Sequence, residues 1–249
     1  MTQYTELILN YPERQKYLSK IGFERENITG IIENISSTDY TELILSEKLT
    51  NWLAFKWKGY SETSKYTYII DNGSNITSVW ENFKDSTRRE IKKAEKQLTI
   101  STTEDVDLFY KINQKTFDRQ KIKNPYSAEL FKKVDAICTE KQCKTIYVAK
   151  DGEGNVHGSV YIVWDNNTTY YLAGGSDPEY RTSGAHSLLM WHAIKDAANR
   201  NHVFDFKGSM IESVERFFRG FGAIQTPYFR LRKYNSKVLK LILPLLYSE

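Results

Sequence analysis

The stretch YYLAGGSDPEYRTSGAHSLLMWHAI, residues 170–194, carries the clearest structural pattern in the chain. Its first part is apolar and aromatic and runs into Gly174 and Gly175, which predicts a strand over residues 169–173 followed by a turn. From residue 183 to residue 199 apolar side chains recur every three or four positions, which predicts a helix. Because the apolar face of this helix is wide, we expect it to pack against a sheet.

The sequence on either side extends this pattern. Two more apolar runs, residues 145–150 and 156–164, come before it, and the turns DGEGN and DNNT separate the three runs, which predicts an antiparallel meander. A strand over residues 203–206, a helix over 212–219 and a strand over 227–233 are expected after it. This order predicts an α+β fold, in which helices pack on both faces of a mixed sheet.

Upstream the patterns are weaker, and the first forty residues predict no element. Residues 79–98 have one apolar stripe at helical spacing, and another face of the same helix carries Lys84, Arg88, Lys92 and Lys96 in one row. The elements expected in this part are strands over residues 42–47, 52–57 and 66–70 and helices over residues 79–98, 105–117 and 128–139.

Composition excludes several classes of protein. A chain of 249 residues with 40% apolar residues can bury a core, so wholesale disorder is excluded. The net charge of +4 restricts any nucleic-acid contact to a local patch. Cys138 and Cys143 lack the further Cys or His that a zinc site needs, so we expect free thiols, and none of the four His has a partner at metal-ligand spacing. The sequence shows no signal-peptide pattern and no bilayer-length apolar run, so we expect a cytoplasmic protein.

Four residues form a candidate anion site at the start of the predicted helix. Arg181, Ser183, Gly184 and Ala185 follow a strand directly, and a helix start presents unpaired backbone N–H groups and a positive dipole end. The alternative is an ordinary helix start that Ser183 caps and Gly184 relaxes, without a ligand. The sequence leaves both interpretations open.

A second group of candidates lies in FDFKGSMIESVERFFRGFG, residues 204–222. Asp205 alternates with two phenylalanines, so its side chain points away from the face on which their rings pack. It is either a base or a carboxylate that backbone donors or Lys207 hold at the sheet edge. Glu215 precedes Arg219 by four residues, which is also the spacing of a simple helical salt bridge.

Two basic segments also have two interpretations each. The cationic row of residues 84–96 either meets the phosphates of a nucleotide-sugar, a coenzyme or a tRNA, or is solvated surface. The segment RLRKYNSKVLKLILPLLYSE, residues 230–249, joins a cationic cluster to an apolar run. It either rests on an anionic membrane surface or forms a terminal helix docked on the core.

Taken together, these motifs resemble the Fem-type branch of the GNAT acyltransferase superfamily. The likeness lies in residues 170–194 and 204–222, with RREIKKAEK at residues 88–96 and FDRQ at residues 117–120. The branch includes peptidoglycan bridge-forming aminoacyltransferases and acetyltransferase domains of envelope-polysaccharide biosynthesis. The resemblance implies a GNAT-like fold with a mixed, mostly antiparallel sheet flanked by helices, with two related lobes. We therefore expect an N-terminal half lobe with the basic helix, 1–100, and a C-terminal acyltransferase domain, 101–249.

The resemblance also implies a donor site. In this superfamily a Q/R-x-x-G-x-G/A loop holds the pyrophosphate of the donor, and Arg181, Gly184 and Ala185 match its start, while His186 stands where the last small residue belongs. That departure is compatible with an aminoacyl-tRNA donor instead of acetyl-CoA. Bridge-forming members carry a Phe-Lys-x-Gly-Phe-Gly stretch whose lysine helps the reaction. Phe218 occupies the position of that lysine here, and the adjacent Arg219 could replace its charge.

Our hypothesis from the sequence is acyl or aminoacyl transfer from acetyl-CoA or aminoacyl-tRNA to a primary amine of a cell-envelope peptide or sugar precursor. The donor is a co-substrate, and no tightly bound cofactor, no metal and no DNA partner are expected; membrane contact is at most peripheral, through the C-terminal segment. The alternatives are a CoA-dependent N-acetyltransferase of a small amine or amino sugar and a non-catalytic RNA- or glycan-binding module. The site residues expected are Asp205, Glu215 and Arg219 for catalysis, Arg181, Ser183, Gly184 and Ala185 for the donor, and Lys56, Tyr68, Arg88, Arg119, Gln120 and Ser209 for the acceptor.

Overall fold

The computed structural model describes residues 7, 9–35, 38–71, 75–208 and 210–246, the last four without their side chains. The chain divides into two compact units. Unit 1 consists of residues 1–66 and 226–249, and unit 2 consists of residues 67–225. These limits differ from the expected division at residue 100, and the strand β2 (Ser61–Ile70) contributes to both units.

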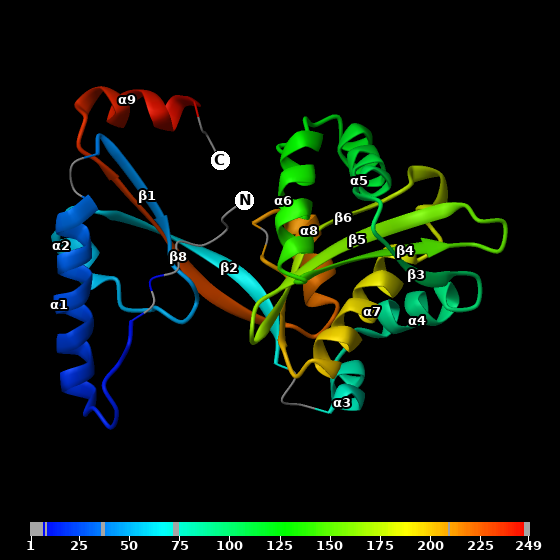
Figure 1. Ribbon diagram of the computed structural model, residues 1–249, viewed down its shortest axis with the longest axis horizontal. Coiled ribbons are helices and arrows are strands. Elements are labelled where there is room, and N and C mark those ends of the chain that lie inside the picture. Colours follow the sequence, from blue (N-terminus) through cyan, green and yellow to red (C-terminus); the bar gives the residue numbers. More distant parts are fainter. Residues whose placement is uncertain (1–6, 8, 36–37, 72–74, 209, 247–249) are drawn as a thin grey trace. The chain divides into compact units, whose positions relative to one another are not determined.

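Unit 2 is a three-layer arrangement around a sheet, as Figure 1 shows. The strands lie in the order β7-β6-β5-β4-β3, and the end of β2 pairs antiparallel with β7. All of these neighbours are antiparallel except β6 and β7, which are parallel. The fold class is therefore the predicted α+β class with a mostly antiparallel sheet. The strands are β3 (Thr99–Thr103), β4 (Lys144–Lys150), β5 (Val156–Trp164), β6 (Thr168–Ser176) and β7 (Val203–Asp205).

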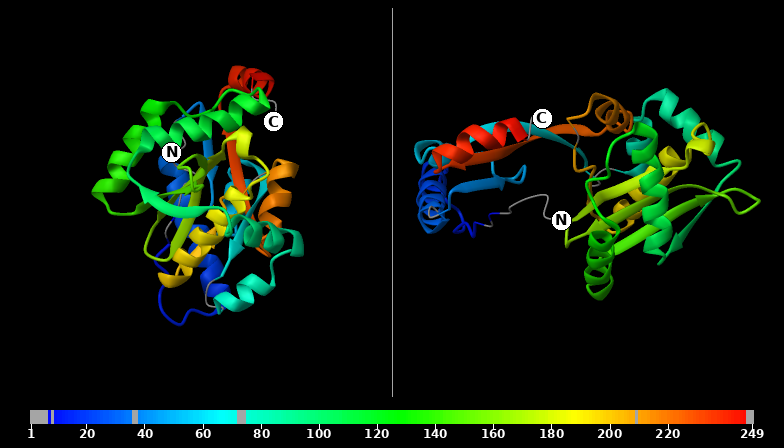
Figure 2. Two further views of the ribbon diagram at one scale, coloured as in Figure 1. Left: turned by 90° about the vertical axis from the view of Figure 1, so that its right-hand side faces the viewer. Right: turned by 90° about the horizontal axis from the view of Figure 1, so that it is seen from above.

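Strand alternation decides which helices cover each face of this sheet. Val160 and Ile162 of β5 pack in a cluster with the helices α4 and α7, whereas Tyr161 between them packs with Phe109 and Phe131 of the helices α5 and α6. In the left view of Figure 2, the strands accordingly lie between α5 and α6 on one side and α7 on the other. The helices of unit 2 are α3 (Ile76–Glu81), α4 (Asp85–Ala94), α5 (Val106–Gln120), α6 (Ala128–Glu140), the 3₁₀ turn η1 (Pro178–Tyr180), α7 (Ala185–Asn199) and α8 (Glu212–Arg219).

Unit 1 has a core of its own. Ile28, Ile32, Leu45, Phe55 and Leu231 are its most buried side chains and come from four separate parts of the chain. β8 pairs antiparallel with β1, with Tyr40 opposite Tyr234. The elements of this unit are α1 (Tyr17–Ile35), β1 (Tyr40–Ile44), α2 (Leu53–Trp57), the first part of β2, most of β8 (Ile224–Tyr234) and α9 (Lys237–Leu246).

The structure corrects three expectations about elements. Residues 52–57, predicted as a strand, form the helix α2, because the neighbours Ala54 and Phe55 both face the core, which strand alternation does not allow. The helix predicted over residues 79–98 is two helices, α3 and α4. The break is fixed by Lys84, whose N–H donates to the carbonyl of Gly220 at 2.9 Å. The first forty residues, for which no element was expected, contain the 19-residue helix α1.

Candidate active site

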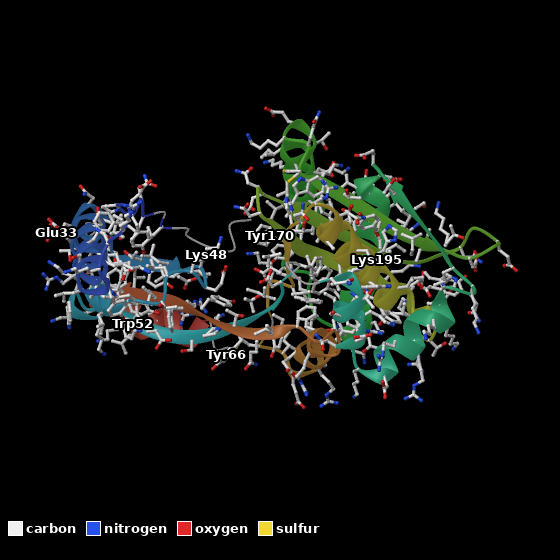
Figure 3. All side chains as sticks on the ribbon, turned by 90° about the horizontal axis from the view of Figure 1, so that it is seen from below. Glu33, Lys48, Trp52, Tyr66, Tyr170 and Lys195 are labelled. Atoms are coloured by element: carbon white, nitrogen blue, oxygen red, sulfur yellow. The ribbon has the colours of Figure 1, made fainter. Side chains whose placement is uncertain are left out.

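The sheet of unit 2 opens where its two parallel strands part. β6 pairs with β7 over residues 168–170, opposite residues 203–205, and among the described residues this pairing ends at Tyr170 and Asp205. β6 continues to Ser176, and its register against β5 shifts so that Leu172 has no residue opposite it. Ligands of such sheets bind beyond the carboxyl ends of strands, and bulges often lie beside active sites. The place where β6 and β7 part, beside Tyr170, the tyrosine labelled on unit 2 in Figure 3, is therefore the candidate active site.

Aromatic side chains pack together beside the place where β6 and β7 part. Tyr171 directly follows Tyr170, the last residue of β6 that pairs with β7. Its hydroxyl lies 3.4 Å from Nε2 of His186 in the first turn of α7. The ring of Tyr171 also contacts that of Phe218 on α8, and His186 contacts Phe217. Burial lowers the pKa of His186 to about 4, so the imidazole is neutral at physiological pH. Sequence reasoning assigned no role to Tyr171, and it treated His186 only as a departure from the family pattern.

Two adjacent glycines shape the strand at this point. A Cβ atom on Gly174 would lie 2.7 Å from the Tyr171 hydroxyl oxygen and 2.8 Å from Cε1 of His186. On the other face, a Cβ on Gly175 would lie 2.6 Å from the carbonyl oxygen of Ile112 in α5. Asn113 of the same helix donates from Nδ2 to the carbonyl of Gly174 at 2.8 Å. Gly174 and Gly175 are therefore part of β6, where the sequence predicted a turn. Neighbouring atoms lie close to them on both faces of the strand.

The predicted donor loop lies at the start of α7. Arg181 is exposed, and Ser183 Oγ accepts from the backbone N–H of Ala185 at 3.3 Å. Gly184 has a φ of +77°, and a Cβ on it would lie 2.9 Å from the carbonyl oxygen of Glu90 in α4. Ala185 is 3% exposed. Gly184 and not Ser183 is the N-cap residue of α7, and the loop packs closely on α4. Its accessible side is the one with Arg181 and Ser183.

Asp205, the expected base, is held by its neighbours. Its carboxylate accepts from the hydroxyl of Thr67 and from the backbone N–H of Lys207, and Lys207 Nζ lies 3.3 Å away. The same ammonium group lies 3.9 Å from the ring centre of Tyr170. Asp205 is only 2% exposed. This is the alternative arrangement considered from the sequence, a carboxylate held at the sheet edge by a backbone donor and Lys207, with Thr67 added by the tertiary structure.

The other two expected catalytic residues lie together on α8. Glu215 accepts from the Tyr68 hydroxyl at 2.9 Å and from Arg219 Nε at 2.9 Å. The hydrogen bond from Tyr68 lowers the pKa of Glu215, and Arg219 lowers it further. The Tyr68 hydroxyl in turn accepts from Gln225 Nε2 at 2.6 Å, a residue that no sequence signal marked. The structure therefore joins Tyr68, an expected acceptor residue, to the expected catalytic pair.

The position of the family lysine is apolar in the structure as well as in the sequence. Phe218 is 3% exposed and contacts the rings of Tyr68, Tyr171 and Phe206. The side chain of Arg219 is 65% exposed and is paired with Glu215. The charge of Arg219 thus lies on the solvent side of α8 and not in the buried position of Phe218.

The remaining expected acceptor residues are dispersed. Lys56 is exposed on α2 of unit 1, whereas the other residues belong to unit 2. Arg119 and Gln120 are exposed at the end of α5, and Ser209 lies outside the described residues. Arg88 is half-buried on α4 and pairs with Asp85.

A cationic hollow lies beside the start of α4. It has a volume of about 430 Å³, and Asp85 is its single acidic lining residue against three cations. Trp80 at its edge packs against Trp191 of α7, with ring centres 5.1 Å apart. α4 therefore contacts the donor loop through one face and presents cations on another, an arrangement suited to phosphate. The residues that line the hollow are Trp80, Asp85, Arg88, Arg89 and Lys92.

These features define the class of protein, and the comparisons agree. The chain matches the family "Acetyltransferase (GNAT) domain" over residues 81–219, more than half of its length, so it belongs to that family. It is an acyltransferase of the GNAT class. No curated protein sequence matches the chain.

Solved structures give a more particular likeness in fold. The chain is similar to FemX, with a TM-score of 0.71 and 13% identity over 88% of this chain and 79% of that one. It is also similar to L-PGS from Bacillus licheniformis, with a TM-score of 0.59 and 11% identity over 92% and 78% of the two chains. A tandem GNAT protein from the clavulanic acid biosynthesis pathway gives a TM-score of 0.53 and 8% identity, over 90% of this chain and 72% of that one. The fold is therefore that of the Fem-type branch, as the motifs predicted.

Proposed function

We propose that this GNAT-class enzyme transfers an acyl or aminoacyl group to a primary amine of a cell-envelope peptide or sugar precursor. The observation that carries the proposal is the parting of the two parallel strands at Tyr170 and Asp205, beside the start of α7. The choice of an envelope precursor rests on the likeness to FemX and L-PGS.

The proposed chemistry is nucleophilic attack by the neutral amine nitrogen on a thioester or ester carbonyl. The new C–N bond forms as the thiolate or the alkoxide leaves, and the proton that the nitrogen loses passes to a base while the leaving group gains a proton. We assign the base to Glu215, whose carboxylate is partly exposed and is joined to Tyr68. Asp205 is a positioning residue in this proposal, because it is only 2% exposed and is paired with Lys207, whereas Glu215 is partly exposed.

The donor is expected to carry phosphate. The cations of the hollow, Arg88, Arg89 and Lys92, lie on the helix against which the donor loop packs. Acetyl-CoA and aminoacyl-tRNA both present phosphates, so the hollow supports either donor. In the donor loop, Arg181 and Ser183 are the residues that are accessible to such a donor.

The test is acyl transfer measured by mass spectrometry with each donor separately. The protein is incubated with acetyl-CoA or with a mixture of charged tRNAs, together with a panel of amino sugars and lysine-containing peptides. We expect one donor to give an N-acylated product. The combined variant Arg88→Gln, Arg89→Gln, Lys92→Gln should raise the KM for that donor at least tenfold, whereas Lys132→Gln, Lys133→Gln on α6 should not.

The residue roles are tested by measuring kcat and the stability of the fold separately for each variant. Glu215→Gln should lower kcat by about 10² or more, with an unchanged midpoint of unfolding. Asp205→Asn should instead lower the free energy of unfolding by about 3 kcal/mol, since Lys207 would lose its buried counter-charge. A full kcat in Glu215→Gln would overturn the assignment of the base. Absence of product with both donors and all amines would overturn the proposed reaction.

A further inference from the structure

The helix α9 of unit 1 presents an apolar stripe to solvent. Val238, Leu241 and Ile242 are 62%, 72% and 45% exposed. Residues spaced by three and four positions lie on the same face of a helix, so these side chains form one continuous stripe. Leu239, on another face, is only half-exposed. Over its described side chains, the helix therefore exposes apolar residues along one face.

Hydrogen bonds fix the start of this helix. The backbone N–H groups of Asn235 and Ser236 both donate to the carbonyl of Asp39, at 2.9 and 3.2 Å. Asn235 Nδ2 donates to the carbonyl of Thr38 at 2.7 Å, immediately before β1. In Figure 1, α9 follows β8 and lies next to the start of β1. Because its first turn is anchored to the strand pair, the stripe has a defined orientation on unit 1.

The charges of α9 indicate what covers the stripe. Lys237 and Lys240 are exposed and lie along one side of the stripe, and the sequence of the helix contains no Asp or Glu. Two copies of the chain packed stripe to stripe would bring like charges together, which disfavours a second copy as the partner. An anionic surface would pair with both lysines and bury the apolar side chains. Among the described residues no helix is long and apolar enough to cross a bilayer, so contact through α9 would be with the membrane surface.

We propose that α9 is an interfacial helix, with which this protein binds the surface of a bilayer containing anionic lipids. Val238, Leu241 and Ile242 enter the boundary between headgroups and acyl chains, and Lys237 and Lys240 contact lipid phosphates. This goes beyond the proposed acyl transfer and does not depend on it. It gives the protein access to acceptors located at a membrane.

The experiment is flotation of the full-length chain with vesicles of phosphatidylcholine alone and with vesicles that also contain 30% phosphatidylglycerol. We expect binding to the anionic vesicles only, and a loss of binding as salt increases. Lys237→Gln, Lys240→Gln should weaken binding about 30-fold, which corresponds to ~1 kcal/mol for each lysine. Val238→Ser, Leu241→Ser, Ile242→Ser should weaken it at least as much, because the apolar side chains are lost.

Matched variants on α6 provide the controls. Ile137 is 54% exposed there, and Lys132 and Lys133 are exposed lysines of the same helix. Ile137→Ser and Lys132→Gln, Lys133→Gln should bind vesicles as the unaltered chain does, and circular dichroism should show that every variant is folded. Absence of binding to anionic vesicles, or equal binding by the α9 variants, would overturn the proposal. So would a stripe variant that converts a dimer to a monomer in sedimentation, since a second copy would then be the partner.

Discussion

At the scale of single residues, Gly175 lies too close to neighbouring backbone to accept a side chain. An added Cβ would meet the backbone of α5 at Ile112 and Asn113, and backbone cannot move aside as a side-chain end can. We expect Gly175→Ala to lower the free energy of unfolding by about 3 kcal/mol or more, as measured by urea denaturation. Gly152→Ala is the matched control, because nothing lies within 4 Å of its added Cβ. Equal midpoints for the two variants would contradict the packing described for β6.

His186 should make stability depend on pH. Its pKa lies near 4 in the folded chain because of burial, below its ordinary value of 6.5, so between these values the unfolded chain binds a proton that the folded chain does not. Stability therefore falls as the pH falls from 6.5 towards 4, by roughly 2 kcal/mol between pH 6.5 and 5. Urea denaturation at several pH values should show that His186→Gln removes this part of the dependence of the free energy of unfolding on pH. Tyr171→Phe, which keeps the imidazole, should retain it, and an unchanged slope in His186→Gln would refute the assignment.

At the scale of the element, α8 decides whether a lysine can act at the position of Phe218. Phe218 packs among four aromatic rings, so an ammonium group there would lose its contact with water. We expect Phe218→Lys to destabilise the fold by about 3 kcal/mol or more without a gain in kcat. Phe218→Leu, which stays apolar, should cost about 1–2 kcal/mol. A stable Phe218→Lys enzyme with raised turnover would show that the family lysine can still act in this chain.

At the scale of the whole molecule, each unit has a separate core, so local stability should divide along the same lines. Ile32 is 1% exposed in the core of unit 1, and Ile162 is fully buried in unit 2. Ile32→Ala should lower hydrogen-exchange protection by about 2–4 kcal/mol in α1 and β1 and leave the amides of β5 unchanged. Ile162→Ala should do the reverse. Equal loss of protection in both units for either variant would indicate one cooperative unit.

The sequence alone determined the elements whose pattern is local and periodic. The meander of β4, β5 and β6, the helix α7, the strand β7 and the helix α8 follow from apolar spacing and turn residues, and the motifs in them led to the Fem-type GNAT resemblance. Strand alternation also predicted that the side chain of Asp205 lies on the opposite face from Phe204 and Phe206.

The tertiary structure alone decided what those residues contact. Thr67 is 138 positions from Asp205, and Tyr68 is 147 positions from Glu215, so no local pattern could pair them. The same holds for the break between α3 and α4, which a contact with Gly220 fixes, and for α2, where burial in the core of unit 1 outweighs strand propensity. Periodicity reports which face of an element is buried, whereas the partner on that face depends on how distant segments pack.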